Sequence, residues 1–284
     1  MSDIDAKNKG VLYVVATPIG NLDDMTPRAI ETLREVDLIL AEDTRHSGKL
    51  LKKFSITSRM KAFHDHNERK ISTELIERLK GGEKIALISD AGTPLVSDPG
   101  YYLINSAQQE GIRIVPIPGP CALIAALSAS GLPSDKFTFH GFLPSRTKAR
   151  QKKLQELKSE TGTQIFYEAP HRLKDTLDDI KDILGSARMA CMARELTKRY
   201  ETIRTGTLID LTHWLSENPE QCRGEIVLVV EGHHEKHTEE GEDQRVLEVL
   251  LEYLPPSQAV AAAVKLTGGK KNQLYRMAQK KSQE

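Results

Sequence analysis

The chain has 284 residues, of which 39% are hydrophobic and 28% are charged, so it is long enough for two domains with sizeable cores. No run of about 18 apolar residues predicts a membrane span, and the polar start MSDIDAKNKG is not typical of a signal peptide. The 40 basic and 40 acidic residues cancel, which excludes binding of a polyanion by net charge alone but not by clustered charge.

Strands and helices alternate through the first half of the chain. Apolar runs bounded by turn residues predict buried strands at 11–15, 36–43, 84–89 and 112–118. Helices are predicted at 27–36, 71–82, 101–111 and 121–130, and the first of them has Thr26 as its N-cap and Pro27 in its first turn. This order predicts a parallel sheet covered on both faces, in an N-terminal α/β domain over residues 10–134.

A second α/β domain is predicted over residues 135–232. Its strands are expected at 137–143, 163–169, 188–195 and 224–232, and its helices at 148–159 and 171–184. The stretch 233–244, HHEKHTEEGEDQ, is charged and lacks apolar periodicity, which favours a solvated linker. His233, His234 and His237 offer a metal site as the alternative, but no strand or helix is expected to fix their geometry, so we expect no metal there.

Residues 245–284 predict a small module of short amphipathic helices. The segments are EDQRVLEVLLEYL, PSQAVAAAVKLTGG and KNQLYRMAQKK, and the turn at Gly268-Gly269 gives the last two the spacing of a helix-turn-helix. No acid lies between Leu254 and Gln283, whereas six bases do. Two interpretations are open: a solvated pair of tail helices packed on the body, or a module that binds a phosphate backbone.

The loops after the strands are where a parallel sheet binds its ligands. Four of them are unusually rich in small and turn-forming residues: ATPIGNLDD, AEDTR, SDAGTPLVSDPG and PIPGPCA. None contains the dinucleotide-binding or phosphate-loop motif, which argues against a Rossmann oxidoreductase and a P-loop NTPase. Small residues let the main chain approach a flat ligand with adenine, ribose and amino-acid ends, although they are equally consistent with tight turns alone.

A set of longer motifs carries a family resemblance. In chain order they are VATPIGNLDDMTPRA, AEDTRHSGKLL, HDHNE, SDAGTPLVSDPG, PIPGPCALIAALSASGLPSD, GFLP, FYEAPHR, ARELTK and GEIVLVVEG. Together they resemble the ribosomal RNA methyltransferase branch of the tetrapyrrole methylase superfamily, the class III S-adenosylmethionine-dependent methyltransferases. The resemblance spans residues 10–232, and KLTGGKKNQLYRMA resembles the helix-turn-helix that this branch carries at its end.

The resemblance implies two α/β domains with the methyl donor S-adenosylmethionine in the cleft between them, and usually a homodimer. It also implies 2'-O-methylation of one cytidine ribose in the decoding region of 16S ribosomal RNA, with the small ribosomal subunit as partner. The first motif departs from the superfamily pattern at Ala16, Pro18 and Asn21. The positions that match donor-binding motifs are Pro18, Gly20, Asp90, Gly92, Thr93, Val96, Ser97, Pro120, Cys121, Ala122, Tyr167, Ala193 and Gly224.

Two short stretches offer a base for the ribose hydroxyl proton. In HDHNE, strand spacing would turn His64 and His66 to one side, whereas a hydrogen-bonded turn before the helix near Ser72 is the alternative. In EDTR, Glu42 and Asp43 are candidates, and a helix cap with an internal ion pair is the alternative. No metal is expected, since methyl transfer from sulfur to oxygen needs none.

RNA contacts require cations near the cleft. The densest cluster outside the tail is in PSRTKARQKK, where a solvated helix face is the alternative to phosphate contact. The candidates are Arg45, His64, Asp65, His66, Glu68, Arg146, Lys148, Arg150, Lys152, Lys153, Arg172, Arg194, Lys270, Lys271 and Arg276.

Two other functions compete with RNA methylation. A methylase acting on tetrapyrroles or another small molecule would have little use for the basic helical module, and a nucleic-acid-binding regulator would not require the methylase motifs. The cysteines Cys121, Cys191 and Cys222 lack the spacing of a disulfide framework or a zinc site. We therefore expect a reduced, cytoplasmic compartment and no membrane partner.

Overall fold

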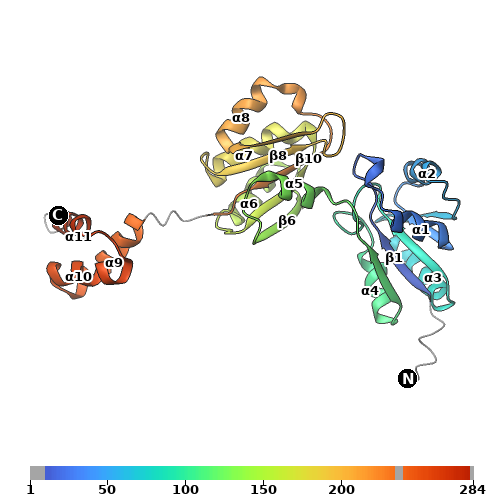
Figure 1. Ribbon diagram of the computed structural model, residues 1–284, viewed down its shortest axis with the longest axis horizontal. Helices are drawn as coiled ribbons and strands as arrows, with labels where there is room; N and C mark the ends of the chain where they lie inside the picture. Colours follow the sequence, from blue (N-terminus) through green and yellow to red (C-terminus); the bar gives the residue numbers. More distant parts are fainter. Residues whose placement is uncertain (1–9, 234–238, 282–284) are drawn as a thin grey trace. The chain divides into compact units, whose positions relative to one another are not determined.

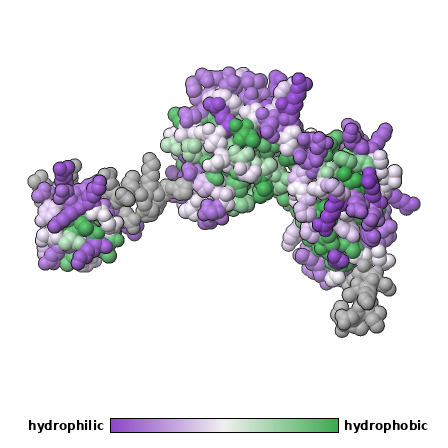
Figure 2. Space-filling model, viewed as in Figure 1, coloured by the Kyte–Doolittle hydropathy of each residue, from purple (hydrophilic) through white to green (hydrophobic). Residues whose placement is uncertain are grey.

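The computed structural model describes residues 10–233 and 239–281, and the chain divides into two compact units, residues 1–232 and 233–284. The first unit holds two five-stranded sheets with their helices, and the second is helical (Figure 1). Figure 2 shows hydrophilic residues over much of the visible face of each unit, as expected where apolar side chains form the interior. No helix in the described residues has the length and apolar character that a membrane crossing requires.

The first sheet is parallel throughout, with strand order β3-β2-β4-β1-β5. Its strands are β1 (Val11–Val15), β2 (Leu38–Ala41), β3 (Met60–Ala62), β4 (Lys84–Ile88) and β5 (Arg113–Ile117). The helices that follow them are α1 (Pro27–Glu35), α2 (Thr44–Lys53), α3 (Glu68–Lys80) and α4 (Tyr101–Gln109), with a short 3-10 helix η2 (Leu22–Asp24) before α1. The predicted parallel sheet is confirmed.

Apolar side chains cover both faces of this sheet. Leu75 and Leu79 of α3 pack with Leu103 of α4 on one face, and Leu33 of α1 packs with Leu51 of α2 on the other. Thr26 caps α1 by accepting a hydrogen bond from the Ala29 amide at 3.2 Å. A sheet buried on both faces fixes its strands, so the loops at its carboxyl edge start from a rigid frame.

Helix α5 (Ala122–Ser130) follows the first sheet in sequence but packs on the second. Its Leu123, Ala126 and Leu127 lie against Ile165 and Val229 of the second sheet. The domain boundary expected at residue 134 therefore falls after a helix that belongs to the second sheet by packing. Glycine and serine in GLPSD suggested a domain break there, whereas the apolar side chains of α5, before that break, already pack on the second sheet.

The second sheet is mixed, with strand order β6-β7-β10-β8-β9. Strands β6 and β7 are parallel, and β10 runs antiparallel to β7 and β8, as does β9 to β8. The strands are β6 (Phe137–Phe142), β7 (Thr163–Glu168), β8 (Met189–Arg194), β9 (Thr202–Thr207) and β10 (Ile226–Val230). The helices are α6 (Thr147–Glu156), η3 (Pro170–Arg172), α7 (Leu173–Leu184), α8 (Leu208–Glu217) and η4 (Pro219–Gln221).

Several elements of the first unit differ from the sequence expectations, among them strand β3, which was not predicted because its three residues form no apolar run. Strand β9 and helix α8 were not predicted, because TIRTGT is a polar edge strand and α8 follows it without a turn residue. Helix α2 was also not predicted, although Asp43 caps it by accepting from the Arg45 amide at 2.8 Å, which is the alternative considered for EDTR. Helix α3 begins at Glu68, before the expected Ile71.

The second unit consists of α9 (Glu239–Tyr253), α10 (Pro256–Thr267) and α11 (Lys271–Lys281). Leu247 of α9, Val260 of α10 and Leu274 of α11 form its buried core. Gly268 ends α10 in the left-handed conformation (φ 76°), which a glycine adopts without strain. The linker prediction for 233–244 was wrong from Glu239 onward, where helix α9 begins. His234 and His237 lie outside the described residues.

Candidate functional site

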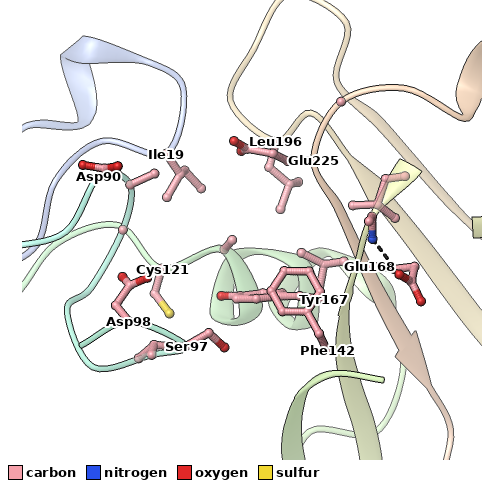
Figure 3. Close-up of a pocket in the computed structure, with 18 of the residues that line it drawn as sticks. Ile19, Asp90, Ser97, Asp98, Cys121, Phe142, Tyr167, Glu168, Leu196 and Glu225 are labelled. Atoms are coloured by element: carbon pink, nitrogen blue, oxygen red, sulfur yellow. Dashed lines mark hydrogen bonds between the residues drawn. The ribbon is translucent and has the colours of Figure 1, made fainter. Parts of the chain in front are cut away.

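A cavity of about 420 Å³ lies within the first unit, between the carboxyl edge of the first sheet and the facing edge of the second. One side is the loop that follows β4, and the other is built from the ends of β6 and β7 and the start of β10 (Figure 3). Because β10 runs antiparallel to β7, its first residues meet the last residues of β7 at the same edge. The lining residues are Ile19, Asp90–Thr93, Val96–Asp98, Cys121, Ala122, Phe142, Tyr167–Pro170, Leu196 and Gly224–Val227.

Backbone hydrogen bonds hold the β4 loop in place. Thr17 and Gly92 exchange both backbone bonds, with the Thr17 amide donating to Gly92 oxygen at 2.9 Å and the Gly92 amide donating back at 3.0 Å. Gly92 has φ +87°, which a glycine tolerates without strain. The Thr93 hydroxyl donates to the Pro120 carbonyl at 3.0 Å and ties this loop to the one after β5. The loop is therefore a preformed wall.

The opposite wall carries aromatic rings. Tyr167 of β7 has its ring centroid 4.8 Å from Phe139 and 5.7 Å from Phe142 of β6, both edge-on. Burial raises the pKa of Tyr167 to about 12, so its hydroxyl stays protonated at neutral pH. Figure 3 shows Tyr167 and Phe142 across the cavity from Asp98 and Ser97. A fixed aromatic wall facing a wall of small residues suits a flat ring system.

Most of the predicted donor positions line this cavity. They are Asp90, Gly92, Thr93, Val96, Ser97, Cys121, Ala122, Tyr167 and Gly224. Pro18 and Gly20 do not. They line a second cavity of about 330 Å³ that also borders Asp90, and Pro18 is one of the positions at which the first motif departs from the superfamily pattern.

Pro120 and Ala193 were placed in the cleft by resemblance, and neither lines the cavity. Pro120 contributes its carbonyl to Thr93, and Ala193 is fully buried within β8, paired with Val227 of β10. Val227 itself lines the cavity, so Ala193 lies one strand too far. Strand alternation alone could not show which of two neighbouring strands reaches the cavity.

Several lining residues were missed, among them Ile19, Asp98, Phe142, Leu196 and Glu225. Asp98 had a signal, because it belongs to the motif SDAGTPLVSDPG, which supplied five other positions. Phe142 and Leu196 had none, since they enter the cavity only through the pairing of strands far apart in sequence.

Carboxylates gather at the side of the cavity formed by the first sheet. Burial raises the pKa of Asp98 from 3.8 to about 6, and the nearby charges of Glu42, Asp90 and Asp65 add to this effect. Burial also raises the pKa of Glu42, with Asp90 and Asp65 contributing. Asp98 is the member of this set with a strongly raised pKa that lines the cavity, and such a carboxyl group is suited to proton transfer near neutral pH.

The residues expected to be catalytic are arranged as a turn and a cap. HDHNE is not a strand: the Asn67 side chain accepts from the His64 amide at 2.9 Å and donates to the Ala62 carbonyl at 3.0 Å. The rings of His64 and His66 lie edge-on at 5.9 Å. Neither they nor Glu42 and Asp43 line the cavity, although the charges of Glu42 and Asp65 act on Asp98.

Four residues that were predicted to contact RNA are instead bound to partners within the fold. Glu68 and Arg150 are two of them. Glu68 is 9% exposed and accepts from the amides of Tyr102 and Leu103 at 2.9 and 3.2 Å, which caps α4. Arg150 is 2% exposed and pairs with Asp179 at 2.6 Å. These two predictions were wrong, because the side chains are committed to partners inside the fold.

Arg172 and Arg194 are likewise committed. Arg172 pairs with the fully buried carboxylate of Glu168 at 2.5 Å. Arg194 donates to the carbonyls of Arg223 and Tyr200 at 2.7 and 3.0 Å and is 9% exposed. Both therefore stabilise the second sheet and the loop beside the cavity rather than facing solvent.

The other basic candidates remain at the surface. Arg45, Arg146, Lys148, Lys152, Lys270, Lys271 and Arg276 are exposed, and Lys153 is half-buried. Lys153 lies 3.7 Å from Glu156, and Arg45 lies 3.6 Å from Asp43. No group of three or more metal-binding side chains occurs in residues 10–233 and 239–281.

The chain matches two family models. Residues 11–212 match the tetrapyrrole (corrin/porphyrin) methylases, and residues 237–282 match the RsmI C-terminal HTH domain. Two curated relatives are named ribosomal RNA small subunit methyltransferase I. The one from Pseudomonas aeruginosa is 54% identical, covering 95% of this chain and 96% of its own. The one from Escherichia coli O157:H7 is 50% identical, covering 95% of each chain.

Solved structures of methyltransferases share the fold of the first unit. The methyltransferase CobJ superposes with a TM-score of 0.58 at 20% identity, over 78% of this chain and 94% of its own. The uroporphyrin-III-C-methyltransferase from Thermus thermophilus gives a TM-score of 0.53 at 20% identity with the same coverage. The chain has a two-sheet fold with a cavity between the edges of the sheets, and the family model and the relatives match most of its length. Together these findings show that the chain belongs to the tetrapyrrole methylase family of methyltransferases, within the ribosomal RNA small subunit methyltransferase I group.

Proposed function

We propose that this chain transfers a methyl group from S-adenosylmethionine to the 2'-hydroxyl of a cytidine ribose in the decoding region of 16S ribosomal RNA. The observation that carries the proposal is the cavity, because nine of the thirteen positions that the methylase motifs assign to the donor line it. The names of the relatives supply the class of acceptor.

The cavity suits the proposed donor in size and chemistry. Its volume of about 420 Å³ is in the range of small-molecule sites. Tyr167 offers a ring face to adenine, and the main chain around Gly92 and Thr93 offers close approach to the rest of the molecule. When bound, S-adenosylmethionine supplies a methyl group on a cationic sulfur. The carboxylates of Asp90, Asp98 and Glu225 give the cavity the opposite charge.

Asp98 is our assignment for the group that accepts the proton of the ribose hydroxyl. As the ribose oxygen gains its methyl group it must lose that proton, and a carboxylate with a pKa of about 6 is ionised at neutral pH yet basic enough to accept it. Glu42 does not line the cavity and assists through its charge, which helps to raise the pKa of Asp98. His64 does not line the cavity either, and in this proposal it contacts the RNA outside it. His66 contacts RNA outside the cavity in this proposal, and Asp43 serves as the cap of α2.

The exposed basic side chains of α6 and the preceding loop form a surface for the RNA backbone. Replacing Arg146, Lys148 and Lys152 with alanine is expected to weaken binding to small ribosomal subunits and to flatten its salt dependence, since each lost phosphate contact lowers the slope by about one. Donor binding should not change, because none of the three lines the cavity. Filter binding at several salt concentrations and donor calorimetry check this. An equal loss of donor and RNA affinity would contradict it.

The function is tested by transfer of an isotopically labelled methyl group from S-adenosylmethionine to small ribosomal subunits that lack the modification. Nucleoside mass spectrometry should then find labelled 2'-O-methylcytidine at one site in the decoding region. Naked 16S ribosomal RNA is the parallel acceptor, and it shows whether the assembled subunit is required. Donor binding without transfer to either acceptor would overturn the RNA substrate and lead to small-molecule acceptors.

Two further parts of the proposal concern assembly and location. The resemblance implies a homodimer, and exposed Ile124 of α5 is an apolar side chain available for such a contact, at 49% exposure. Light scattering that gives the mass of one chain would exclude the dimer.

We also propose a cytoplasmic location, where the substrate is made and where Cys121, Cys191 and Cys222, all free in the structure, remain reduced.

A further inference from the structure

Two exposed tyrosines begin helix α4, shortly after the loop that lines the cavity. Tyr101 is 75% exposed and Tyr102 is 42% exposed. They follow the loop whose residues Asp90–Asp98 line the cavity, and α4 begins at the carboxyl edge of the first sheet, as the cavity loops do. A single exposed tyrosine is ordinary. Tyr101 and Tyr102 follow Asp98 of the cavity by three and four residues, so two exposed rings come directly after the loop that forms one cavity wall.

The backbone that carries these tyrosines is fixed from both sides. The buried Glu68 carboxylate accepts from the Tyr102 and Leu103 amides, so the first turn of α4 is anchored to α3. Gly100 before it has φ +136°, and a Cβ there would lie 2.8 Å from Leu87. A tyrosine on a fixed backbone has only two side-chain torsions to order when it binds a partner, so it loses little entropy.

A cation lies over the ring of Tyr102. The Arg69 guanidinium lies 6.0 Å from the centroid of the Tyr102 ring, and Arg69 is exposed. Within residues 10–233 and 239–281 no carboxylate forms an ion pair with it. The guanidinium is therefore free to meet an anion while it stacks on the ring. We call Arg69, Tyr101 and Tyr102 the α4 aromatic patch.

We propose that the α4 aromatic patch binds an unpaired nucleotide adjacent to the methylated ribose, with its base stacked on Tyr101 and its phosphate near Arg69. Unstacked bases bind single-strand proteins through aromatic rings and arginine planes, which are the groups displayed here. Tyr101 lies three residues after Asp98 of the cavity, so in this proposal a nucleotide bound at the patch holds its neighbour at the cavity. This inference rests on the proposed function, because it concerns the RNA that presents the ribose.

Tyr101→Ala is expected to raise the KM for small ribosomal subunits about tenfold, because stacking of one base contributes on that order. The kcat and the donor affinity should stay near the wild-type values, since Tyr101 does not line the cavity. Tyr101→Phe keeps the ring and should keep the wild-type KM. Phe137→Ala is the matched control: Phe137 is 40% exposed at the start of β6, whereas the end of that strand at Phe142 borders the cavity.

A second measurement is independent of methyl transfer. A single-stranded RNA oligonucleotide containing 2-aminopurine should lose fluorescence on binding wild-type protein and Tyr101→Phe, but much less with Tyr101→Ala at equal occupancy. Quenching by the wild type without methyl transfer to subunits would keep the patch and overturn the proposed function. Methyl transfer with an unchanged KM in Tyr101→Ala, or equal quenching by that variant, would overturn the patch alone. A parallel loss of donor affinity in Tyr101→Ala would also overturn it.

Discussion

Asp98→Asn is expected to lower the kcat for methyl transfer by about 10²- to 10⁴-fold at pH values well above 6, the usual contribution of a positioned general base. The substitution keeps the size of the side chain and removes its ability to accept a proton. Wild-type kcat should rise as the pH passes through about 6, where Asp98 ionises, and then level off. The variant should lack this rise. Single-turnover transfer of labelled methyl across the pH range measures both effects.

The same substitution should stabilise the fold at neutral pH. The folded pKa of Asp98 is raised from 3.8 to about 6, so the unfolded chain ionises first as the pH rises, and the native state loses stability between about pH 4 and pH 6. Two pKa units correspond to about 3 kcal/mol, an upper bound because Asp98 is only partly buried. Asp98→Asn should therefore raise the Tm above pH 6 and leave it unchanged below pH 4.

The effect of Asp98→Asn on donor affinity distinguishes a proton acceptor from a residue that pairs with a positive group of the donor. If the main role of Asp98 is to pair with a positive group of the donor, Asp98→Asn will weaken donor binding in calorimetry and high donor concentrations will restore the rate. A proton acceptor predicts near-normal donor affinity and no rescue. Asp135→Asn is the matched control, since Asp135 is an exposed acid before β6 and does not line the cavity.

The first sheet and one wall of the cavity could be predicted from sequence because their signals are local. Val11–Val15 and Lys84–Ile88 are apolar runs followed by turn residues, and strands of that kind in alternation with helices define a parallel sheet. The loop motif after β4 then supplied Asp90, Gly92 and Thr93 together. In each case the residues that matter lie within one short segment.

The opposite wall could not be predicted in the same way. Phe142, Leu196 and Glu225 come from three segments that only strand pairing brings together. The role of Glu68 has the same origin, because the amides it caps lie 34 and 35 positions along the chain. A carboxylate in a polar stretch is expected to face solvent. Only the position of α4 in the fold shows that Glu68 caps that helix.

Arg150 did carry a local signal. Arg150, Leu154 and Leu157 are spaced i, i+4 and i+7, the spacing of one helix face, and all three are buried. The run of neighbouring cations in TKARQKK concealed this pattern, since Arg146, Lys148 and Lys152 are exposed. The density of positive charge predicted a basic surface for the whole segment. The helical spacing of Arg150 with Leu154 and Leu157 would have assigned Arg150 to the interior.

Arg150→Ala should consequently lower the free energy of unfolding by about 3–5 kcal/mol, the usual cost of leaving one member of a buried ion pair without its partner. The Arg150 side chain is 3% exposed, and its Nε lies 2.6 Å from Asp179, whose other oxygen accepts from Gln151 at 2.7 Å. Alanine would leave that carboxylate buried and without its cation. Urea unfolding followed by circular dichroism measures the loss.

The exposed Lys148 on the same helix provides the control, because Lys148→Ala should change the stability by no more than about 0.5 kcal/mol. The double variant Arg150→Met, Asp179→Leu removes both charges and should recover most of the lost stability, since an apolar pair of similar volume often replaces a buried ion pair without cost. If Arg150→Ala leaves the urea midpoint unchanged while RNA binding loses one phosphate contact in its salt slope, then Arg150 faces RNA and its assignment to the interior is wrong.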